Sequence, residues 1–164
     1  MLSVGLLSDI FDGIIARKLK VSTQKLRRLD STVDQIFFIS VAIATYLQCP
    51  SFFKQNLVQI LILLSFEALA YLFCYIKFKK EIATHSIGAK FWTLLLFALL
   101  VDVMIDCKAT LLFQLCFYVG IATRLEIIAI IFALKKWTND VPSFYHALQL
   151  RKGKQIKRNQ LFNG

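Results

Sequence analysis

The stretch LVQILILLSFEALAYLFCYI, residues 57–76, is twenty residues long and contains one charged side chain, Glu67. The hydrocarbon of a bilayer is about 30 Å thick, so a helix that rises 1.5 Å per residue crosses it in about 20 residues. Four further segments are apolar: residues 1–16, 29–47, 91–105 and 110–134. None alternates with the period of two that marks a barrel strand. We therefore predict an all-α integral membrane protein, a polytopic bundle of about five membrane helices.

The composition excludes most other classes of protein. Of the 164 residues, 57% are apolar and 18% are charged, and the mean hydropathy is +0.62. An ordinary soluble protein is roughly 45–50% apolar and about 25% charged. The net charge of +10 would suit nucleic acid, but here the basic residues lie between hydrophobic runs and form no face on a soluble module. We expect membrane lipids, and no nucleic acid, as partners.

The basic residues predict the orientation of the chain. Three segments carry seventeen of the twenty Lys and Arg residues: 17–28, 77–90 and 135–158. The two alternate loops hold only Lys54 and Lys108, and Arg124 lies inside an apolar run. Basic loops are enriched on the cytoplasmic side of membrane proteins. We predict a multi-pass protein whose basic side faces the cytoplasm, with a membrane domain over residues 1–134 and a basic cytoplasmic tail over residues 135–164.

The tail and the cysteines add two smaller expectations. The tail is basic and amphiphilic, which is typical of a segment that lies on a membrane surface. Cys49 and Cys107 lie on the weakly basic side and are candidates for a disulfide, whereas Cys74 and Cys116 are expected in the core.

Four of the ten acidic residues lie within the first 34 positions, in or beside apolar helix: Asp9, Asp12, Asp30 and Asp34. A charged side chain at the centre of a bilayer costs roughly 2.5–3.5 kcal/mol on insertion scales, so such carboxylates usually have a partner or a function. The first two are three residues apart and the last two are four apart, so each pair shares one face of a helix. Two antiparallel neighbouring helices would bring all four carboxylates to a similar depth.

Four converging carboxylates repel one another unless cations lie between them. Oxygen ligands without a nearby His or Cys favour Mg²⁺, Mn²⁺ or Ca²⁺ over zinc. Four carboxylates can hold two ions about 3.5–4 Å apart, an arrangement that suits displacement at phosphorus. The alternative is helix capping and ion pairs with the adjacent basic loop, which is the commoner role for any single aspartate.

Residues 9–34 read DIFDGIIARKLKVSTQKLRRLDSTVD. The order Asp-x2-Asp-Gly-x2-Ala-Arg, followed at this distance by Asp-x3-Asp, resembles the signature of the CDP-alcohol phosphatidyltransferases. In that family, six membrane helices hold a CDP-linked lipid or alcohol at the cytoplasmic side. An acceptor hydroxyl attacks the phosphate next to the lipid and expels CMP. The resemblance therefore implies an enzyme of phospholipid biosynthesis with two Mg²⁺ or Mn²⁺ ions, a donor such as CDP-diacylglycerol and a small alcohol acceptor.

The resemblance also implies roles for single residues. The carboxylates that it implies as metal ligands are Asp9, Asp12 and Asp30. Asp34 would be the general base and an additional metal ligand, because a carboxylate within hydrogen-bond reach can take the proton of the attacking hydroxyl. Four positions would line the pocket for the nucleotide and its diphosphate: Gly13, Ala16, Arg17 and Thr23. Members of the family often form homodimers.

The chain departs from the family pattern at two places. Leu26 stands where the family usually has a second glycine, so an isobutyl group occupies a place of close approach. Met1 is only eight residues before Asp9, so we expect a truncated membrane domain that lacks the first helix of the family.

Two basic residues further along are candidates for binding the acceptor. Residues 86–90, SIGAK, are similar to a loop of the family that ends in a Gly and a Lys near the site, which makes Lys90 a candidate; the alternative is an ordinary basic loop residue. Arg124 either binds a phosphate of the acceptor or pairs with Glu67 as a structural link. Such residues favour a phosphorylated acceptor, with glycerol 3-phosphate and inositol phosphate as the candidates.

Two other functions compete with this one. A non-catalytic relative, in which the acidic cluster binds cations or a partner helix, is compatible with Leu26 and with a missing helix. A cation transporter would need polar residues deep in several helices, and the runs at 57–76 and 91–105 offer only Glu67 and Asp102.

Overall fold

The computed structural model describes residues 24–80, 82, 86–108, 110–139 and 141–154, with side chains from residue 32 onward. Two compact units divide the chain between Ile39 and Ser40, and each is described by itself. The helices in the described part are α2 (Gln24–Gln48), α3 (Pro50–Gln55), α4 (Leu57–Phe78), α5 (Ile87–Asp106), α6 (Thr110–Ala133) and α7 (Phe144–Arg151). The described residues contain no strand, and the predicted all-α class is confirmed.

Within the described residues, three helices are long and apolar enough to cross a membrane: α4, α5 and α6. In α2, residues Thr32–Gln48 form a shorter apolar helix. The sequence predicts an apolar helix over residues 91–105, and the helix in the structure, α5, is longer: it begins at Ile87 and ends at Asp106. The predicted helix at 1–16 lies outside the described residues. The protein is an integral membrane protein.

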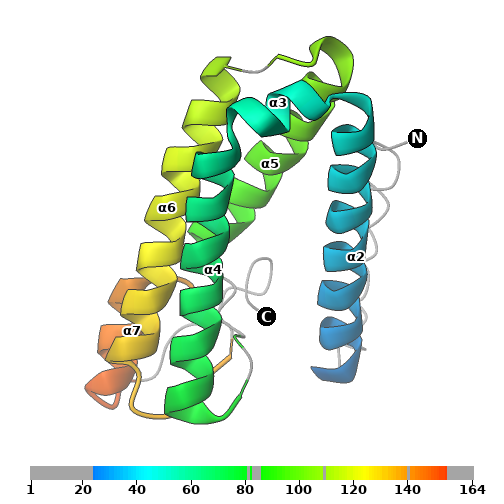
Figure 1. Cartoon of the computed structure of the whole chain (residues 1–164). Helices are drawn as coiled ribbons and strands as arrows, with labels where there is room; N and C mark the ends of the chain where they lie inside the picture. The colour runs from blue at the N-terminus through cyan, green and yellow to red at the C-terminus, as the bar shows by residue number, and fades with distance from the viewer. Residues whose placement is uncertain (1–23, 81, 83–85, 109, 140, 155–164) are drawn as a thin grey trace. The chain divides into compact units, whose positions relative to one another are not determined.

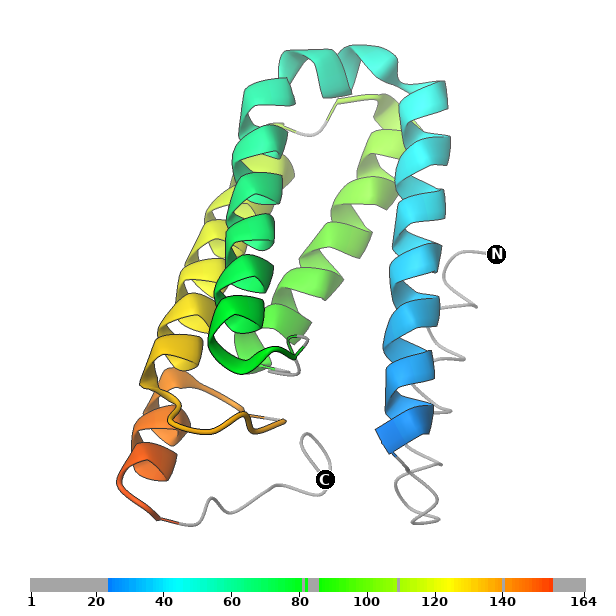
Figure 2. The same cartoon turned by 60° about the horizontal axis from the view of Figure 1, so that its bottom comes forward.

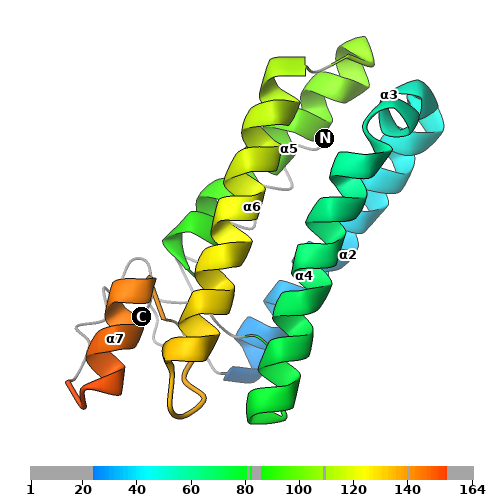
Figure 3. The same cartoon turned by 60° about the vertical axis from the view of Figure 1, so that its left-hand side comes forward.

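Helix α6 is the centre of the second unit, where it packs against α4, α5 and α7. Figures 1 and 3 show α5 and α6 side by side along the bundle, with α7 beside the last turns of α6. The buried positions of α6 recur every three or four residues, as expected for a helix that buries one face. They include Cys116, Gly120, Thr123 and Ile127. Most of the exposed side chains of α4, such as Leu61 and Leu72, are apolar, which suits a helix surrounded by lipid.

One end of this unit, which we call the basic end, carries the residues that connect α4 to α5 and α6 to α7. Lys79, Lys80, Lys135 and Lys136 are exposed there. The Nζ of Lys77 donates to the carbonyl oxygens of Ile131 and Phe132, each at 2.9 Å, and so satisfies groups that the end of α6 leaves without a helical partner. This lysine is therefore part of the packing as well as of the charge asymmetry.

Helix α7 folds back onto α6 at the basic end. Ile130, Ala133 and Leu134 form a buried cluster with Val141 and Ala147. Phe144 and Tyr145 are exposed, as are Arg151, Lys152 and Lys154. The start of the tail thus forms a short helix attached to the bundle.

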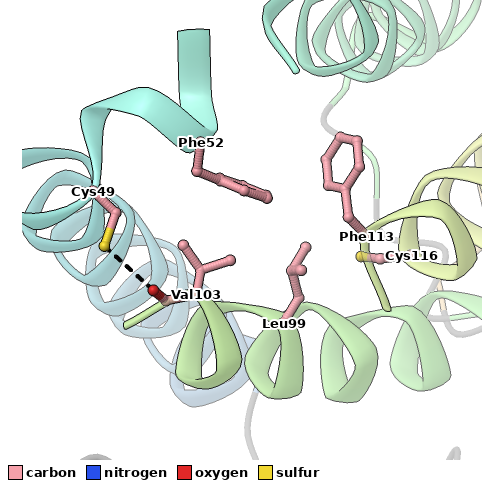
Figure 4. Close-up of a cluster of buried hydrophobic side chains, with 6 residues drawn as sticks. All are labelled: Cys49, Phe52, Leu99, Val103, Phe113 and Cys116. Carbon is pink, nitrogen blue, oxygen red and sulfur yellow. Dashed lines mark hydrogen bonds between the residues drawn. The ribbon is translucent and has the colours of Figure 1, made fainter. Parts of the chain in front are cut away.

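The opposite end, which we call the cysteine end, carries α3 and the turn from α5 to α6. Helix α3 begins at Pro50, a residue that suits the first position of a helix because it has no N–H to satisfy. Figure 2 shows α3 joining the end of α2 to the start of α4. Phe52 of α3 meets Phe113 edge to face with ring centroids 5.4 Å apart, and Leu99 and Val103 belong to the same buried cluster (Figure 4).

Candidate functional site

The structure places two of the predicted metal ligands on α2. Asp30 and Asp34 are four residues apart in one continuous helix, so they share a face. Residues 24–31 of α2 include Lys25, Arg27 and Arg28, whereas residues 36–47 carry no charged side chain, so the two positions lie where the helix changes from polar to apolar. Asp34 is half-buried. A carboxylate pair at such a boundary can stay hydrated while it faces a lipid headgroup.

The remaining predicted metal ligands and the predicted nucleotide-binding residues belong to the part of the chain that the structure does not describe. Asp9, Asp12, Gly13, Ala16, Arg17 and Thr23 lie outside the described residues, as does the side chain of Asp30. Among the side chains that the structure describes, no three metal-binding groups cluster together. The chemistry of the predicted donor set nevertheless fits a hard divalent cation, because every donor is a carboxylate oxygen.

The segment Ser86–Lys90 forms the start of α5 at the basic end. Ser86 is buried, and its Oγ accepts a hydrogen bond of 3.1 Å from the backbone N–H of Ala89, which is the usual action of an N-terminal cap. A Cβ added to Gly88 would lie 3.0 Å from Thr123 Cγ2 and 3.1 Å from Glu126 Oε2. Gly88 therefore allows α5 to approach α6 closely, and Lys90, one turn after the cap, is half-buried.

Glu126 connects this corner to the start of α7. Its Oε1 accepts a hydrogen bond from the backbone N–H of Phe144, at 3.4 Å. A carboxylate at the N-terminus of a helix interacts favourably with the helix dipole. The N–H of Ile87 donates to the carbonyl oxygen of Pro142, at 3.1 Å, so the segment before α7 also holds the start of α5.

Arg124 and Glu67 form an ion pair between α6 and α4. The Nε of Arg124 lies 2.6 Å from Glu67 Oε2, and the arginine side chain is 10% exposed. Arg124 is nine residues from the end of α6, which places it about 14 Å along the helix from that end. An Nη also donates to Thr123 Oγ1, at 3.2 Å. One of the two roles predicted for Arg124, the link to Glu67, is thus present in the structure.

The indole of Trp92 completes the surroundings of Arg124. The guanidinium carbon lies 3.7 Å from the centre of the Trp92 ring, a cation–π contact. The indole Nε1 donates to the carbonyl oxygen of Cys116, at 3.0 Å. A Cβ on Gly120 would lie 2.6 Å from that Nε1, so the absence of a side chain at this position makes room for the indole.

Sequence reasoning missed the parts played by Trp92, Gly120 and Glu126. Glu126 lies in the apolar run at 110–134 and therefore needs a partner, but nothing in the sequence indicates that this partner is the start of α7. A glycine in the middle of a long apolar run does signal a close approach, and Gly120 lies one helical turn from Arg124 on the same face. The position of Gly120 one turn from Arg124 was therefore the feature of the sequence that could have indicated close packing beside the arginine.

Comparison with protein families identifies the chain. The family model for CDP-alcohol phosphatidyltransferase matches residues 1–134. The chain belongs to this family, a family of phosphotransferases of phospholipid synthesis that is generally dependent on divalent cations. Comparison with curated proteins and with solved structures gave no match.

Proposed function

We propose that this protein transfers a phosphatidyl group from a CDP-activated lipid, such as CDP-diacylglycerol, to an alcohol acceptor and releases CMP. The observation that carries the proposal is the aspartate motif, which lies within the family match, together with the placement of Asp30 and Asp34 on one face of α2. Their position between the basic start of α2 and its uncharged stretch at residues 36–47 suits chemistry on a lipid phosphate at the membrane surface.

The proposed division of labour follows the chemistry of the side chains. Asp9, Asp12 and Asp30 hold two Mg²⁺ or Mn²⁺ ions, with Asp34 as an additional ligand. Bound there, the ions would offset the charge of the diphosphate and stabilise the departing CMP. Asp34 takes the proton from the acceptor hydroxyl.

The nucleotide and its diphosphate would lie against the chain between the aspartates. Gly13 and Ala16 are small and allow close approach to the helix backbone, and Thr23 donates a hydrogen bond. Arg17 offers a guanidinium fork that matches phosphate oxygens. Leu26, at the position where the family pattern has a glycine, would narrow that pocket.

For the acceptor we propose a phosphorylated alcohol, such as glycerol 3-phosphate or inositol phosphate, with Lys90 and Arg124 as the residues that bind its phosphate. Arg124 already donates from Nε to Glu67 and from an Nη to Thr123. A guanidinium has five N–H groups, so a phosphate would use those that remain. We propose that this site faces the cytoplasm, because the segments 17–28, 77–90 and 135–158 carry seventeen of the twenty lysines and arginines.

The test is release of CMP from CDP-diacylglycerol in membranes that contain the protein, with and without Mg²⁺ and with each acceptor in turn. We expect release that requires both Mg²⁺ and an acceptor, and a loss of at least about 100-fold in Asp34→Asn, the usual size of a general-base contribution. Asp106→Asn is the matched control, because this exposed aspartate ends α5 outside the motif.

Near-full activity in Asp34→Asn would show that the general-base assignment is wrong. If no acceptor supports release of CMP from a folded protein, the chain is the non-catalytic relative.

A further inference from the structure

Cys49 and Cys107 form a disulfide at the cysteine end of the bundle. Their Cα atoms are 5.3 Å apart, near the usual separation in a disulfide, and 58 positions separate them in the sequence. Cys49 lies between α2 and α3, and Cys107 follows the last turn of α5. The bond therefore joins two ends of helices that are distant in the chain.

Both cysteines pack in the buried cluster at this end of the bundle. Cys49 is 1% exposed and belongs to the cluster that contains Phe52 and Val103. Its Sγ lies 3.3 Å from the carbonyl oxygen of Val103, the dashed contact in Figure 4. A disulfide sulfur has no hydrogen to donate, so this contact is a hydrogen bond only when Cys49 is a thiol.

The same end of the bundle carries little positive charge. That end has Lys54, in α3, and Lys108, whereas the segment from the last turn of α4 to the first turn of α5, at the basic end, alone has Lys77, Lys79, Lys80 and Lys90. Basic loops are enriched on the cytoplasmic side, and disulfides persist in oxidising, non-cytoplasmic compartments. Charge and cysteine chemistry are independent criteria, and both place the cysteine end away from the cytoplasm.

We propose that Cys49 and Cys107 are an oxidation site on the non-cytoplasmic face of the membrane, and that their disulfide is a staple that fastens the end of α2 to α5. An oxidised dithiol carrier of that compartment would accept the two electrons and two protons of the thiols and become a dithiol. The Nε2 of Gln48 donates to the carbonyl oxygen of Met104, at 3.0 Å, so a hydrogen bond holds the same two segments together.

The staple acts on the helix that carries the proposed catalytic aspartates. Helix α2 is continuous from Gln24 to Gln48, and the cross-linked residue Cys49 comes directly after its last turn. The existence of the staple and the side on which it forms do not depend on the proposed function.

The first experiment detects the bond in cells that express the full chain with Cys74→Ala and Cys116→Ala, which removes the two free cysteines. Cells are quenched with acid, and the precipitated protein is dissolved in denaturant at neutral pH with N-ethylmaleimide, which blocks free thiols. The protein is then treated with a polyethylene glycol maleimide before and after reduction. We expect no added polymer before reduction and two polymers per chain after it. Adding Cys107→Ser leaves Cys49 as an unpaired thiol, which is blocked at the first step, so this control takes up none after reduction. Free thiols at both positions in the quenched cells would overturn the proposal.

The second experiment determines the side of the membrane. Lys54 and Lys80 are exposed at opposite ends of the bundle. Each is replaced separately, Lys54→Cys and Lys80→Cys, in a chain whose four natural cysteines are alanine, and right-side-out membrane vesicles receive a membrane-impermeant maleimide. We expect labelling of the first variant in sealed vesicles and of the second only after lysis. The reverse pattern would contradict the proposal.

The third experiment tests whether the bond acts as a staple. Reduction should lower the melting temperature of the purified protein by roughly 3–10 °C, and it should leave a Cys49→Ala, Cys107→Ala variant unchanged. An unchanged melting temperature of the natural chain after complete reduction would show that the disulfide does not fasten the two helices.

Discussion

Replacement of Gly120 by alanine tests the packing that positions Arg124. The new Cβ would lie 2.6 Å from Trp92 Nε1 and 2.7 Å from Leu63 Cδ2, whereas ordinary contacts begin near 3.4 Å. The indole cannot easily move away, because its N–H donates to the carbonyl oxygen of Cys116 and its face lies against the Arg124 guanidinium. We expect the clash to displace the indole and weaken both contacts.

The magnitude follows from three contributions. Overpacking of a filled site costs about 1–3 kcal/mol, and a lost hydrogen bond costs about 1 kcal/mol. The higher helix propensity of alanine returns up to about 1 kcal/mol. The net loss in free energy of unfolding for Gly120→Ala is therefore about 1–3 kcal/mol, which corresponds to a fall of roughly 2–12 °C in melting temperature for a chain of this size.

The assay is thermal unfolding of the purified protein in detergent, followed by circular dichroism. Ala122→Gly is the matched control, because residue 122 is an exposed position two residues further along α6, where the exchange changes helix propensity without a clash. A second comparison repeats Gly120→Ala in a Trp92→Phe background, which removes the crowded nitrogen. There the penalty should shrink by about 1 kcal/mol or more. A Gly120→Ala protein as stable as the natural one, or an equal penalty in both backgrounds, would refute the packing argument.

Two further predictions follow from single contacts and a third from the proposed metal site. Glu67→Leu leaves Arg124 buried without its carboxylate partner and should destabilise the protein by about 3–5 kcal/mol. In the same unfolding assay, the double variant Glu67→Leu, Arg124→Leu should recover most of that loss. Equal stability of the single and double variants would contradict this prediction. Lys77→Met removes the donor to two carbonyl oxygens of α6 and should lower the free energy of unfolding by about 1–3 kcal/mol. Replacement of the exposed Lys135 by Met is the control and should be nearly neutral. An unchanged stability of Lys77→Met would show that water satisfies these carbonyl oxygens equally well. Removal of divalent cations by EDTA should abolish release of CMP, and Mg²⁺ or Mn²⁺ should restore it; undiminished release in EDTA would contradict the two-ion proposal.

The long helices were predictable because the bilayer imposes a length and a polarity on each of them. Runs of twenty apolar residues have few alternatives in a membrane, so α4 and α6 lie where the sequence predicts them to within two residues. The short helices α3 and α7 were not predicted, because a helix of six or eight residues is stabilised by what it packs against and has little signal of its own.

The polar contacts divide in the same way. The pair Arg124–Glu67 was one of two predicted roles, since a charge within an apolar run requires a partner and few are available. The stacking of Trp92 on Arg124 depends on the register between α5 and α6, which no local pattern encodes. The Cys49–Cys107 bond was a candidate because both residues lie in loops on one side of the membrane.

Binding of Mn²⁺ to the purified full chain, followed by calorimetry and electron paramagnetic resonance with CDP-diacylglycerol present, tests the central claim most directly. The account predicts two ions per chain, and weaker binding with fewer ions when Asp12 or Asp30 is changed to asparagine, while Asp106→Asn binds normally. If no ion binds even in the presence of the nucleotide lipid, the aspartates of this chain do not form the proposed metal site.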